Sequence, residues 1–204
     1  MRGFEKLVVA STNPGKLREI GQILAPLGIE VSPQSDFAVP EAEEPYDTFV
    51  ENALAKARHA AQRTGLPALA DDSGICVDAL GGAPGVHSAR FAGEPRSDGR
   101  NNGKLLEMLA GQTNRAAHYY CVIVVMRHGA DPQPLIAQGL WHGEILKAPR
   151  GSGGFGYDPL FLDIESGQTG AELAPARKNL MSHRGKALAL LAQTLAGRPG
   201  APGF

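Results

Sequence analysis

Apolar and polar residues alternate in blocks along the first third of the chain, and their periodicity predicts strands that alternate with helices. Short apolar runs bounded by glycine, proline or polar residues predict strands, whereas apolar residues repeating every three or four positions predict helices. In chain order the predicted elements are a strand at Lys6–Ala10, a helix at Lys16–Leu27, a strand at Ile29–Ser32, a helix at Thr48–Thr64 and a strand at Ala68–Ala70. The last of these strands is expected to end at the polar residues Asp71–Gly74.

The rest of the chain is richer in extended patterns. The predicted elements are a helix around Asn102–Leu109, long strands at Ala117–Arg127 and Leu135–Leu146, a short strand at Pro159–Leu162 and a helix at Arg184–Leu195. Strands that first alternate with helices and then follow one another predict an α/β fold with a mixed central β-sheet flanked by helices. We expect a single domain over residues 1–196 and a disordered tail over residues 197–204.

Composition and charge are those of an ordinary globular enzyme. Of 204 residues, 43% are hydrophobic and 20% are charged, and the formal net charge is -1. This balance gives no general attraction to nucleic acid or anionic lipid, and no apolar run approaches the ~18 residues of a membrane span. The N-terminus has no signal-peptide pattern. Cys76 and Cys121 lie in apolar segments without a Cys-x-x-Cys pair, so we expect free thiols and a cytoplasmic location.

Polar residues interrupt the periodic pattern at four places, the first of which follows the first predicted strand. Ser11-Thr12-Asn13-Pro14-Gly15-Lys16 leads into a helix, with Asn13 as a favourable N-cap and Pro14 at the first helical position. Such a turn presents free backbone N–H groups and the Lys16 ammonium to an anion, which favours phosphate. The Walker A pattern is incomplete, because its first glycine is missing and Leu17 follows Lys16. An ordinary tight turn is the alternative.

The second place is Asp71-Asp72-Ser73-Gly74, where two carboxylates follow the third predicted strand. The carboxyl end of a strand is where α/β sheets place their ligands, and carboxylates there suit Mg²⁺, which takes oxygen ligands and keeps water and phosphate in its shell. Neighbouring strand residues point to opposite faces, so only one of the two is expected to reach a shared site directly. The acidic segment with Glu41, Glu43 and Glu44 could supply a second carboxylate. A solvated turn is the alternative.

The third place is Gly153-Gly154-Phe155-Gly156-Tyr157-Asp158-Pro159, in which glycines surround two aromatic residues and an acid. Glycines allow the backbone to approach a ligand closely, and an aromatic ring offers a flat face on which a base can stack. A β-turn carrying two core aromatic residues is the alternative.

The fourth place is Lys178 followed by Ser182-His183-Arg184-Gly185-Lys186, where the last predicted helix begins. Cationic side chains beside a helix N-terminus favour an anion. A capped helix with solvated basic residues is the alternative.

Taken together, these motifs resemble the inosine triphosphate pyrophosphatase family (RdgB/HAM1-like proteins). The resemblance covers residues 6–195 and lies in Ser11–Lys16, Thr48–Ala53, Ala70–Gly74, Gly85–Phe91, Gly154–Pro159 and Ser182–Gly185. It implies an enzyme that hydrolyses non-standard purine nucleoside triphosphates (dITP/ITP, dXTP/XTP) to the nucleoside monophosphate and pyrophosphate. It also implies two lobes with the active site in the cleft between them, Mg²⁺ as cofactor and a homodimer. Neither a nucleic-acid partner nor a membrane partner is expected.

The resemblance further implies roles for individual residues. Asp72 matches a proton acceptor and metal ligand, and Lys16 a second catalytic residue. Glu44 is the favoured second metal ligand, with Glu43 or Glu41 as alternatives. The implied substrate contacts are Ser11, Thr12, Asn13, Pro14, Gly15, Lys16, Ser73, Phe155, Gly156, Tyr157, Asp158, Lys178, His183 and Arg184. Thr12 departs from the family pattern, because many members carry glycine there.

A hydrolytic mechanism fits these residues. An activated water attacks the α-phosphorus, Lys16 and the turn N–H groups hold the β- and γ-phosphates, and Asp72, or Asp71 beside it, orients or deprotonates the water. A donor in the His183–Arg184 turn pairs with the keto oxygen of hypoxanthine or xanthine. Two other functions stay open: a pyrophosphatase for modified pyrimidine nucleoside triphosphates, and a non-catalytic nucleotide-binding protein.

Overall fold

The computed structural model describes residues 4–197, so the predicted tail lies outside the described residues except for Gly197. The strands and α-helices are β1 (Lys6–Val9), α1 (Pro14–Leu24), β2 (Glu30–Pro33), α2 (Phe49–Thr64), β3 (Ala68–Val77), α3 (Asp98–Met108), β4 (Ala116–Met126), β5 (Leu135–Ile145), β6 (Phe161–Leu162), α4 (Pro175–Met181) and α5 (His183–Leu195). Short 3-10 helices lie at Ala25–Leu27, Gln34–Phe37, Asp78–Leu80 and Gly85–Arg90. Within residues 4–197 no helix combines the length and apolar character needed to cross a membrane.

The strands form one sheet in the order β2-β1-β3-β4-β5-β6. β1 runs parallel to both β2 and β3, with Leu7 opposite Val31 and Val9 opposite Leu69, whereas β6 is antiparallel to β5. Parallel pairs at one end and an antiparallel pair at the other make the sheet mixed. The predicted α/β class, a mixed sheet flanked by helices, is confirmed.

The chain divides into two compact units, and neither is a continuous stretch of sequence. The first unit contains the chain up to Asp72, the segment Val122–Gln138 and the chain from Lys186 onward. The second contains Ser73–Cys121 and Gly139–Gly185. The chain therefore passes from one unit to the other inside β3, β4 and β5 and once more near the start of α5.

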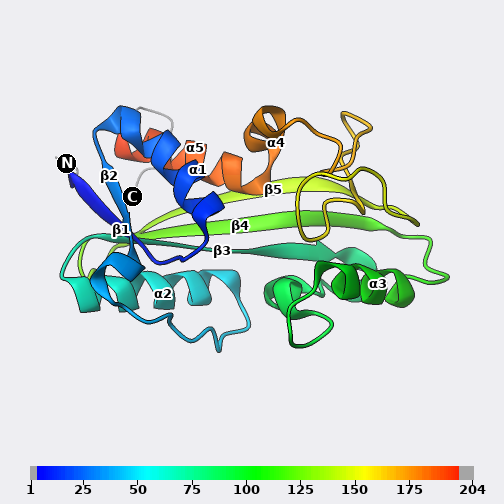
Figure 1. The fold of residues 1–204 in the computed structure, drawn as a ribbon, viewed down its shortest axis with the longest axis horizontal. Coiled ribbons are helices and arrows are strands. Elements are labelled where there is room, and N and C mark those ends of the chain that lie inside the picture. Colours follow the sequence, from blue (N-terminus) through cyan, green and yellow to red (C-terminus); the bar gives the residue numbers. More distant parts are fainter. Residues whose placement is uncertain (1–3, 198–204) are drawn as a thin grey trace. The chain divides into compact units, whose positions relative to one another are not determined.

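In the first unit, β1 is an interior strand, and its side chains after Lys6 are buried on both faces. Leu7, Val8 and Val9 have no exposed surface, because α1 and α5 cover one face of the strands while α2 covers the other (Figure 1). Helices on both sides of parallel strands produce such continuous apolar runs. The sequence Leu7–Val9 is thus apolar at every position rather than at alternate ones.

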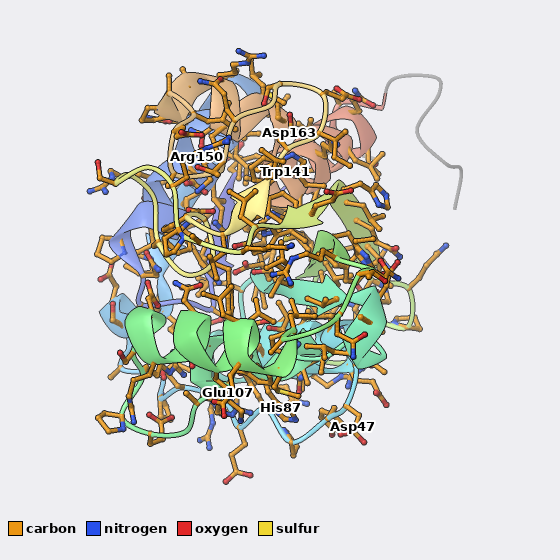
Figure 2. The ribbon with its side chains drawn as sticks, turned by 90° about the vertical axis from the view of Figure 1, so that its right-hand side faces the viewer. Asp47, His87, Glu107, Trp141, Arg150 and Asp163 are labelled. Atoms are coloured by element: carbon orange, nitrogen blue, oxygen red, sulfur yellow. The ribbon has the colours of Figure 1, made fainter. Side chains whose placement is uncertain are left out.

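The core of the second unit is built on aromatic residues. Tyr119, Trp141 and Phe161 lie in contact, with the Phe161 ring centroid 4.8 Å from each of the other two. The indole N–H of buried Trp141 donates to Asp163 Oδ1 at 2.8 Å, and the two residues lie together in Figure 2. Leu105 and Leu109, from the end of α3, belong to the same core. The indole hydrogen bond satisfies a polar group that burial would otherwise leave without a partner.

One predicted boundary is wrong in a way that matters for the site. The sequence predicted that the third strand ends at Ala70, but β3 continues through Asp71–Gly74 to Val77. The apolar residues Ile75–Val77 extend the strand, and the two aspartates meet lysines instead of water, so they do not break it. The sequence also missed α4, because its seven residues are too few for a clear helical period.

The turn between β4 and β5 provides a test of the fold. Asp131 is buried and accepts hydrogen bonds from Arg127 Nε at 2.8 Å, Arg127 N at 2.9 Å and Gln133 N at 3.0 Å. The bond from the Arg127 guanidinium, helped by the backbone N–H groups, holds the pKa of Asp131 well below its ordinary value. We therefore expect Asp131→Asn to lower the Tm at pH 7.

This stabilisation has a defined pH dependence. Because the pKa of Asp131 is lower in the folded state, its contribution is fully present above the unfolded value of about 3.9 and declines as the pH falls below it. Thermal unfolding of the wild type and Asp131→Asn between pH 7 and pH 3 should show a Tm difference that shrinks in acid. A difference that stays constant over this range would contradict the assigned role.

Candidate active site

In β3, Asp71 and Asp72 are adjacent in sequence and each meets a lysine from a different helix. Lys16 of α1 places Nζ 2.8 Å from Asp71 Oδ1, and Lys56 of α2 places Nζ 3.6 Å from Asp72 Oδ1. Since α1 and α2 cover opposite faces of the strands (Figure 1), the pairing matches the alternation of side chains along a strand. The two carboxylates therefore lie on opposite faces of the strand.

Lys56 also binds the acidic segment. Its Nζ lies 2.6 Å from Glu44 Oε1, so a single ammonium connects Glu44 and Asp72. One turn earlier in α2, buried Asn52 exchanges hydrogen bonds with the backbone of Tyr46, accepting from N at 3.1 Å and donating to O at 2.9 Å. These contacts hold the acidic segment against α2.

The three candidate glutamates of this segment have different surroundings. Glu44 shares Lys56 with Asp72, as described above. Glu41 is exposed and accepts a hydrogen bond from Thr12 Oγ1 at 2.9 Å, which connects it to the turn before α1. Glu43 is exposed. Of the three, Glu44 is the one that the structure places beside Asp72.

Burial and neighbouring charges set the protonation of this cluster. Burial raises the pKa of Asp72, Glu44 and Asp71 raise it further, and Lys56 and Lys16 oppose the rise. For Lys56, burial lowers the pKa, but the carboxylates of Asp72, Asp71 and Glu44 outweigh burial and leave it raised. Lys56 thus stays cationic at neutral pH, while Asp72 is a stronger base than an exposed aspartate.

The donor set can be tested against the implied magnesium ion. Over residues 4–197, no three His, Cys, Asp or Glu side chains converge on a common point. Mg²⁺ does not require such a cage, because it is usually bound by one or two carboxylates and keeps waters and substrate phosphates as its other ligands. Asp72 and Glu44 offer oxygen donors of this kind, so the residues present fit the ion.

In the turn before α1, backbone N–H groups donate hydrogen bonds to side chains of the same turn. Asn13 Oδ1 accepts hydrogen bonds from Gly15 N at 2.8 Å and Lys16 N at 3.3 Å, which confirms Asn13 as N-cap, and Pro14 is the first helical residue. Asn13 N donates to Ser11 Oγ, and Ser11 N donates to Val9 O. The prediction that the turn leaves its N–H groups free is wrong for these groups. An anion would meet the Lys16 ammonium, and it would gain the Gly15 and Lys16 N–H groups only by displacing Asn13 Oδ1.

In the second unit, Asp158 organises the glycine-rich loop. Its buried Oδ2 accepts a hydrogen bond from Phe155 N at 2.8 Å and is paired with Lys178 Nζ. A Cβ added at Gly154 would lie 2.2 Å from Asp158 Oδ2, and one added at Gly170 would lie 2.7 Å from Oδ1. These two glycines therefore leave the space in which the Asp158 carboxylate sits.

The two aromatic residues of this loop have different environments. Phe155 is 62% exposed, and its ring centroid lies 4.9 Å from Lys178 Nζ. Tyr157 is only 3% exposed, and its hydroxyl donates to Ser88 O at 2.8 Å. The loop is therefore not a turn with two core aromatics, because Tyr157 is buried and Phe155 is exposed.

The Ser182–Gly185 motif connects α4 to α5 where the two helices approach closely. Ser182 Oγ accepts a hydrogen bond from Gly185 N at 3.1 Å, and the His183 ring stacks on Tyr119 with centroids 4.7 Å apart and planes at 8°. Arg184 is 9% exposed, and its Nη2 donates to Ser73 Oγ at 3.4 Å. Two implied substrate contacts, Ser73 and Arg184, therefore lie together.

The implied site residues thus form two groups, one in each unit. The group in the first unit is Ser11–Lys16, Glu44, Asp71 and Asp72, and the group in the second is Ser73, Phe155–Asp158, Lys178, His183 and Arg184. The sequence missed Lys56, which belongs with the first group. One feature of the sequence could have indicated Lys56: it lies between Ala53 and Ala57 on the buried side of α2, four positions after Asn52. Convergence of both groups on one ligand stays a prediction.

Fold and site together indicate an α/β protein equipped to bind phosphate. Comparison with known proteins makes this specific, because the model of the Ham1 family matches residues 7–194. The chain belongs to the Ham1 family, and the resemblance drawn from its motifs is confirmed.

Similar proteins match over almost their whole length. The chain is 66% identical to a dITP/XTP pyrophosphatase of Nitrosomonas europaea over 192 residues, which are 94% of this chain and 95% of the relative. It is 61% identical to a dITP/XTP pyrophosphatase of Ralstonia nicotianae, covering 94% and 97% of the two chains. Among solved structures, a HAM1 protein from Coxiella burnetii has a TM-score of 0.92 at 50% identity, covering 94% of this chain and 98% of that one.

The close approach of α4 to α5 yields a paired stability test. A Cβ added at Gly185 would lie 1.6 Å from Asn179 O, which is backbone, whereas one added at Gly103 within α3 meets nothing within 4 Å. We expect Gly185→Ala to lower the free energy of unfolding by about 3 kcal/mol, the upper part of the range for overpacking. Gly103→Ala should raise it by about 0.5–1 kcal/mol, because alanine favours helix more than glycine does.

Urea denaturation of both variants measures these changes. Equal stability of Gly185→Ala and the wild type would show that the two helices do not approach as described.

Proposed function

We propose that this protein is a nucleoside-triphosphate pyrophosphatase that hydrolyses dITP/ITP and dXTP/XTP to the nucleoside monophosphate and pyrophosphate. The observation that carries the proposal is its similarity to proteins that are dITP/XTP pyrophosphatases, which are 58–66% identical to it over at least 92% of its length. The buried carboxylates and lysines of the first unit support hydrolysis of a phosphate anhydride.

In the proposed reaction, water attacks the α-phosphorus and forms the new phosphorus–oxygen bond. The bond from the α-phosphorus to the bridging oxygen breaks, and pyrophosphate leaves with that electron pair. Asp72 takes the proton of the water, with Asp71 as the alternative acceptor. The raised pKa of Asp72 supports this role, because a base is most effective when its pKa approaches the working pH.

Lysine side chains of the first unit provide the positive charge that a triphosphate needs. Lys16 is proposed to bind the β- and γ-phosphates, leaving Asp71 as it does so. Lys56 keeps Glu44 and Asp72 together and offsets the repulsion between them. Positioned charge of this kind is the main contribution of a protein to phosphoryl transfer.

Asp72 and Glu44 are the residues proposed to hold Mg²⁺, with exposed Glu43 and Glu41 as alternatives. When bound, the ion supplies neutralisation of the charge that develops on the phosphate oxygens. Lys56 keeps the two carboxylates close enough to share a cation.

Residues of the second unit are proposed to recognise the base. Phe155 offers an exposed ring for stacking, and the His183–Arg184 turn offers donors to the keto oxygen of hypoxanthine or xanthine. Adenine has an amino group in that place, so a buried donor would lose its partner, which is a strong basis for rejection. Homodimer assembly stays a prediction of the resemblance, and a cytoplasmic location stays a prediction from the two cysteines.

Replacement of each aspartate by asparagine tests which of the two accepts the proton. Asp72→Asn removes both a base and a metal ligand, so we expect kcat to fall roughly 10³-fold or more. Asp71→Asn should reduce kcat less, because it removes only the partner of Lys16. Initial rates of pyrophosphate release from ITP measure both. A larger loss of kcat in Asp71→Asn than in Asp72→Asn would show that Asp71 is the proton acceptor. Near-normal turnover of Asp72→Asn would refute the role assigned to Asp72.

A substrate panel tests the proposed function itself. Pyrophosphate release should be fast with ITP and XTP and slower by about 10⁴-fold with ATP, because a donor left unpaired discriminates by this factor. GTP and a modified pyrimidine triphosphate complete the panel, and every rate should fall to background when EDTA removes the metal. Preference for the pyrimidine would favour the rival pyrophosphatase, whereas binding of ITP without pyrophosphate release would favour a non-catalytic nucleotide-binding protein.

A further inference from the structure

The main chain of Gly156 is held from both sides by α3. Gly156 N donates to Asp98 Oδ2 at 2.6 Å, and Gly156 O accepts from Asn102 Nδ2 at 2.9 Å. Asp98 and Asn102 are four positions apart and therefore lie on the same side of the helix. Both polar groups of one residue in the aromatic loop are thus bound by side chains more than 50 positions earlier in the chain.

Packing around Gly156 does not by itself fix this part of the loop. The residue has a φ of +62°, a conformation that glycine adopts easily, and an added Cβ would meet nothing within 4 Å. A backbone with such freedom takes one position only when other contacts restrain it. The hydrogen bonds from Asp98 and Asn102 supply that restraint.

The side chain of Asn102 has a buried polar atom that lowers the stability of the folded protein. Its Oδ1 is buried and has no hydrogen-bond partner within the described part of the chain. A buried acceptor without a partner costs free energy, so its presence calls for an explanation. The other end of the same amide group provides one, because Nδ2 binds Gly156 O.

These contacts restrain the exposed ring that precedes Gly156. Phe155 N donates to Asp158 Oδ2, so Phe155 lies between two fixed points, Asp158 on one side and Gly156 on the other. Phe155 nevertheless remains 62% exposed. An aromatic ring held in place before the ligand arrives loses little freedom when a base stacks on it.

We propose that Asp98 and Asn102 are positioning residues that hold Phe155 as a preformed stacking surface for the purine base. They act through Gly156 and set the affinity for the nucleotide, while the chemistry at the phosphates proceeds without them. This inference rests on the proposed function, and it adds two residues that lie outside the motifs of the sequence.

Kinetics of single variants test the proposal. Asp98→Ala and Asn102→Ala should raise KM for ITP about tenfold, within the range for loss of base stacking, with kcat changed less than twofold. Asp98→Asn keeps an acceptor for Gly156 N and should remain within about threefold of the wild type. Glu107→Ala is the matched control, because Glu107 is an exposed carboxylate on the side of α3 turned away from the strands (Figure 2); it should leave both constants unchanged.

Two inhibitors separate recognition of the base from recognition of phosphate. IMP carries the base and inorganic triphosphate does not, so the alanine variants should weaken inhibition by IMP about tenfold and leave inhibition by inorganic triphosphate unchanged. Equal weakening of both would indicate general distortion and overturn the proposal. An unchanged KM in both alanine variants would also overturn it.

Amide hydrogen exchange provides a readout that does not depend on turnover. The alanine variants should speed exchange over residues 153–158 at least tenfold, whereas Glu107→Ala should not. If the wild type releases no pyrophosphate from ITP, the proposed function fails, and the exchange data still decide whether Asp98 and Asn102 restrain the loop. If one alanine variant does not fold, the other decides the question, and exchange over residues 153–158 equal to that of the wild type would overturn the proposal.

Discussion

Burial of two adjacent carboxylates in one strand is the constraint on which the rest of the first unit depends. A carboxylate removed from water is costly unless a cation accompanies it. Because successive strand residues face opposite ways, Asp71 and Asp72 cannot share a single partner on one side. One lysine from each flanking helix is required, and Lys16 and Lys56 meet that requirement. The placement of α1 and α2 is therefore tied to charge as well as to apolar packing.

The second unit also buries a carboxylate beside a lysine, but the surrounding structure is different. Asp158 is buried beside a lysine, Lys178, but glycines rather than a strand create its space. The loop around it exposes one ring, Phe155, and buries the other, Tyr157. In both units a buried ion pair lies directly beside groups that the family resemblance assigns to the substrate. Binding a triphosphate would then exchange protein partners for ligand partners, which limits the net cost of removing charge from water.

Local features of this fold could be predicted from the sequence, and features that depend on distant partners could not. The Asn13 cap, the Pro14 helix start and the end of α2 at Gly65 need only neighbouring residues, and all are found in the structure. The predicted third strand ends too early, because the lysines that permit two buried aspartates are distant in sequence: Lys56 lies 16 residues before Asp72, and Lys16 lies 55 residues before Asp71. The sequence does not indicate Lys56 for the same reason. The sequence does not distinguish the two rings of the aromatic loop, since sequence spacing alone does not show that the Tyr157 hydroxyl binds Ser88.

The way the chain passes between the units has a consequence for how such proteins can change in length. The first half of β4 belongs to the second unit and the rest to the first, whereas β3 and β5 begin in the first unit and end in the second. Loss of one residue inside any of these strands would turn the later side chains of that strand to the opposite face. Because each strand continues into the other unit, a deletion within its first part would invert the packing of its second part. Viable variation in length is confined to connecting segments such as residues 127–134, so the spacing within the long strands is fixed across the molecule.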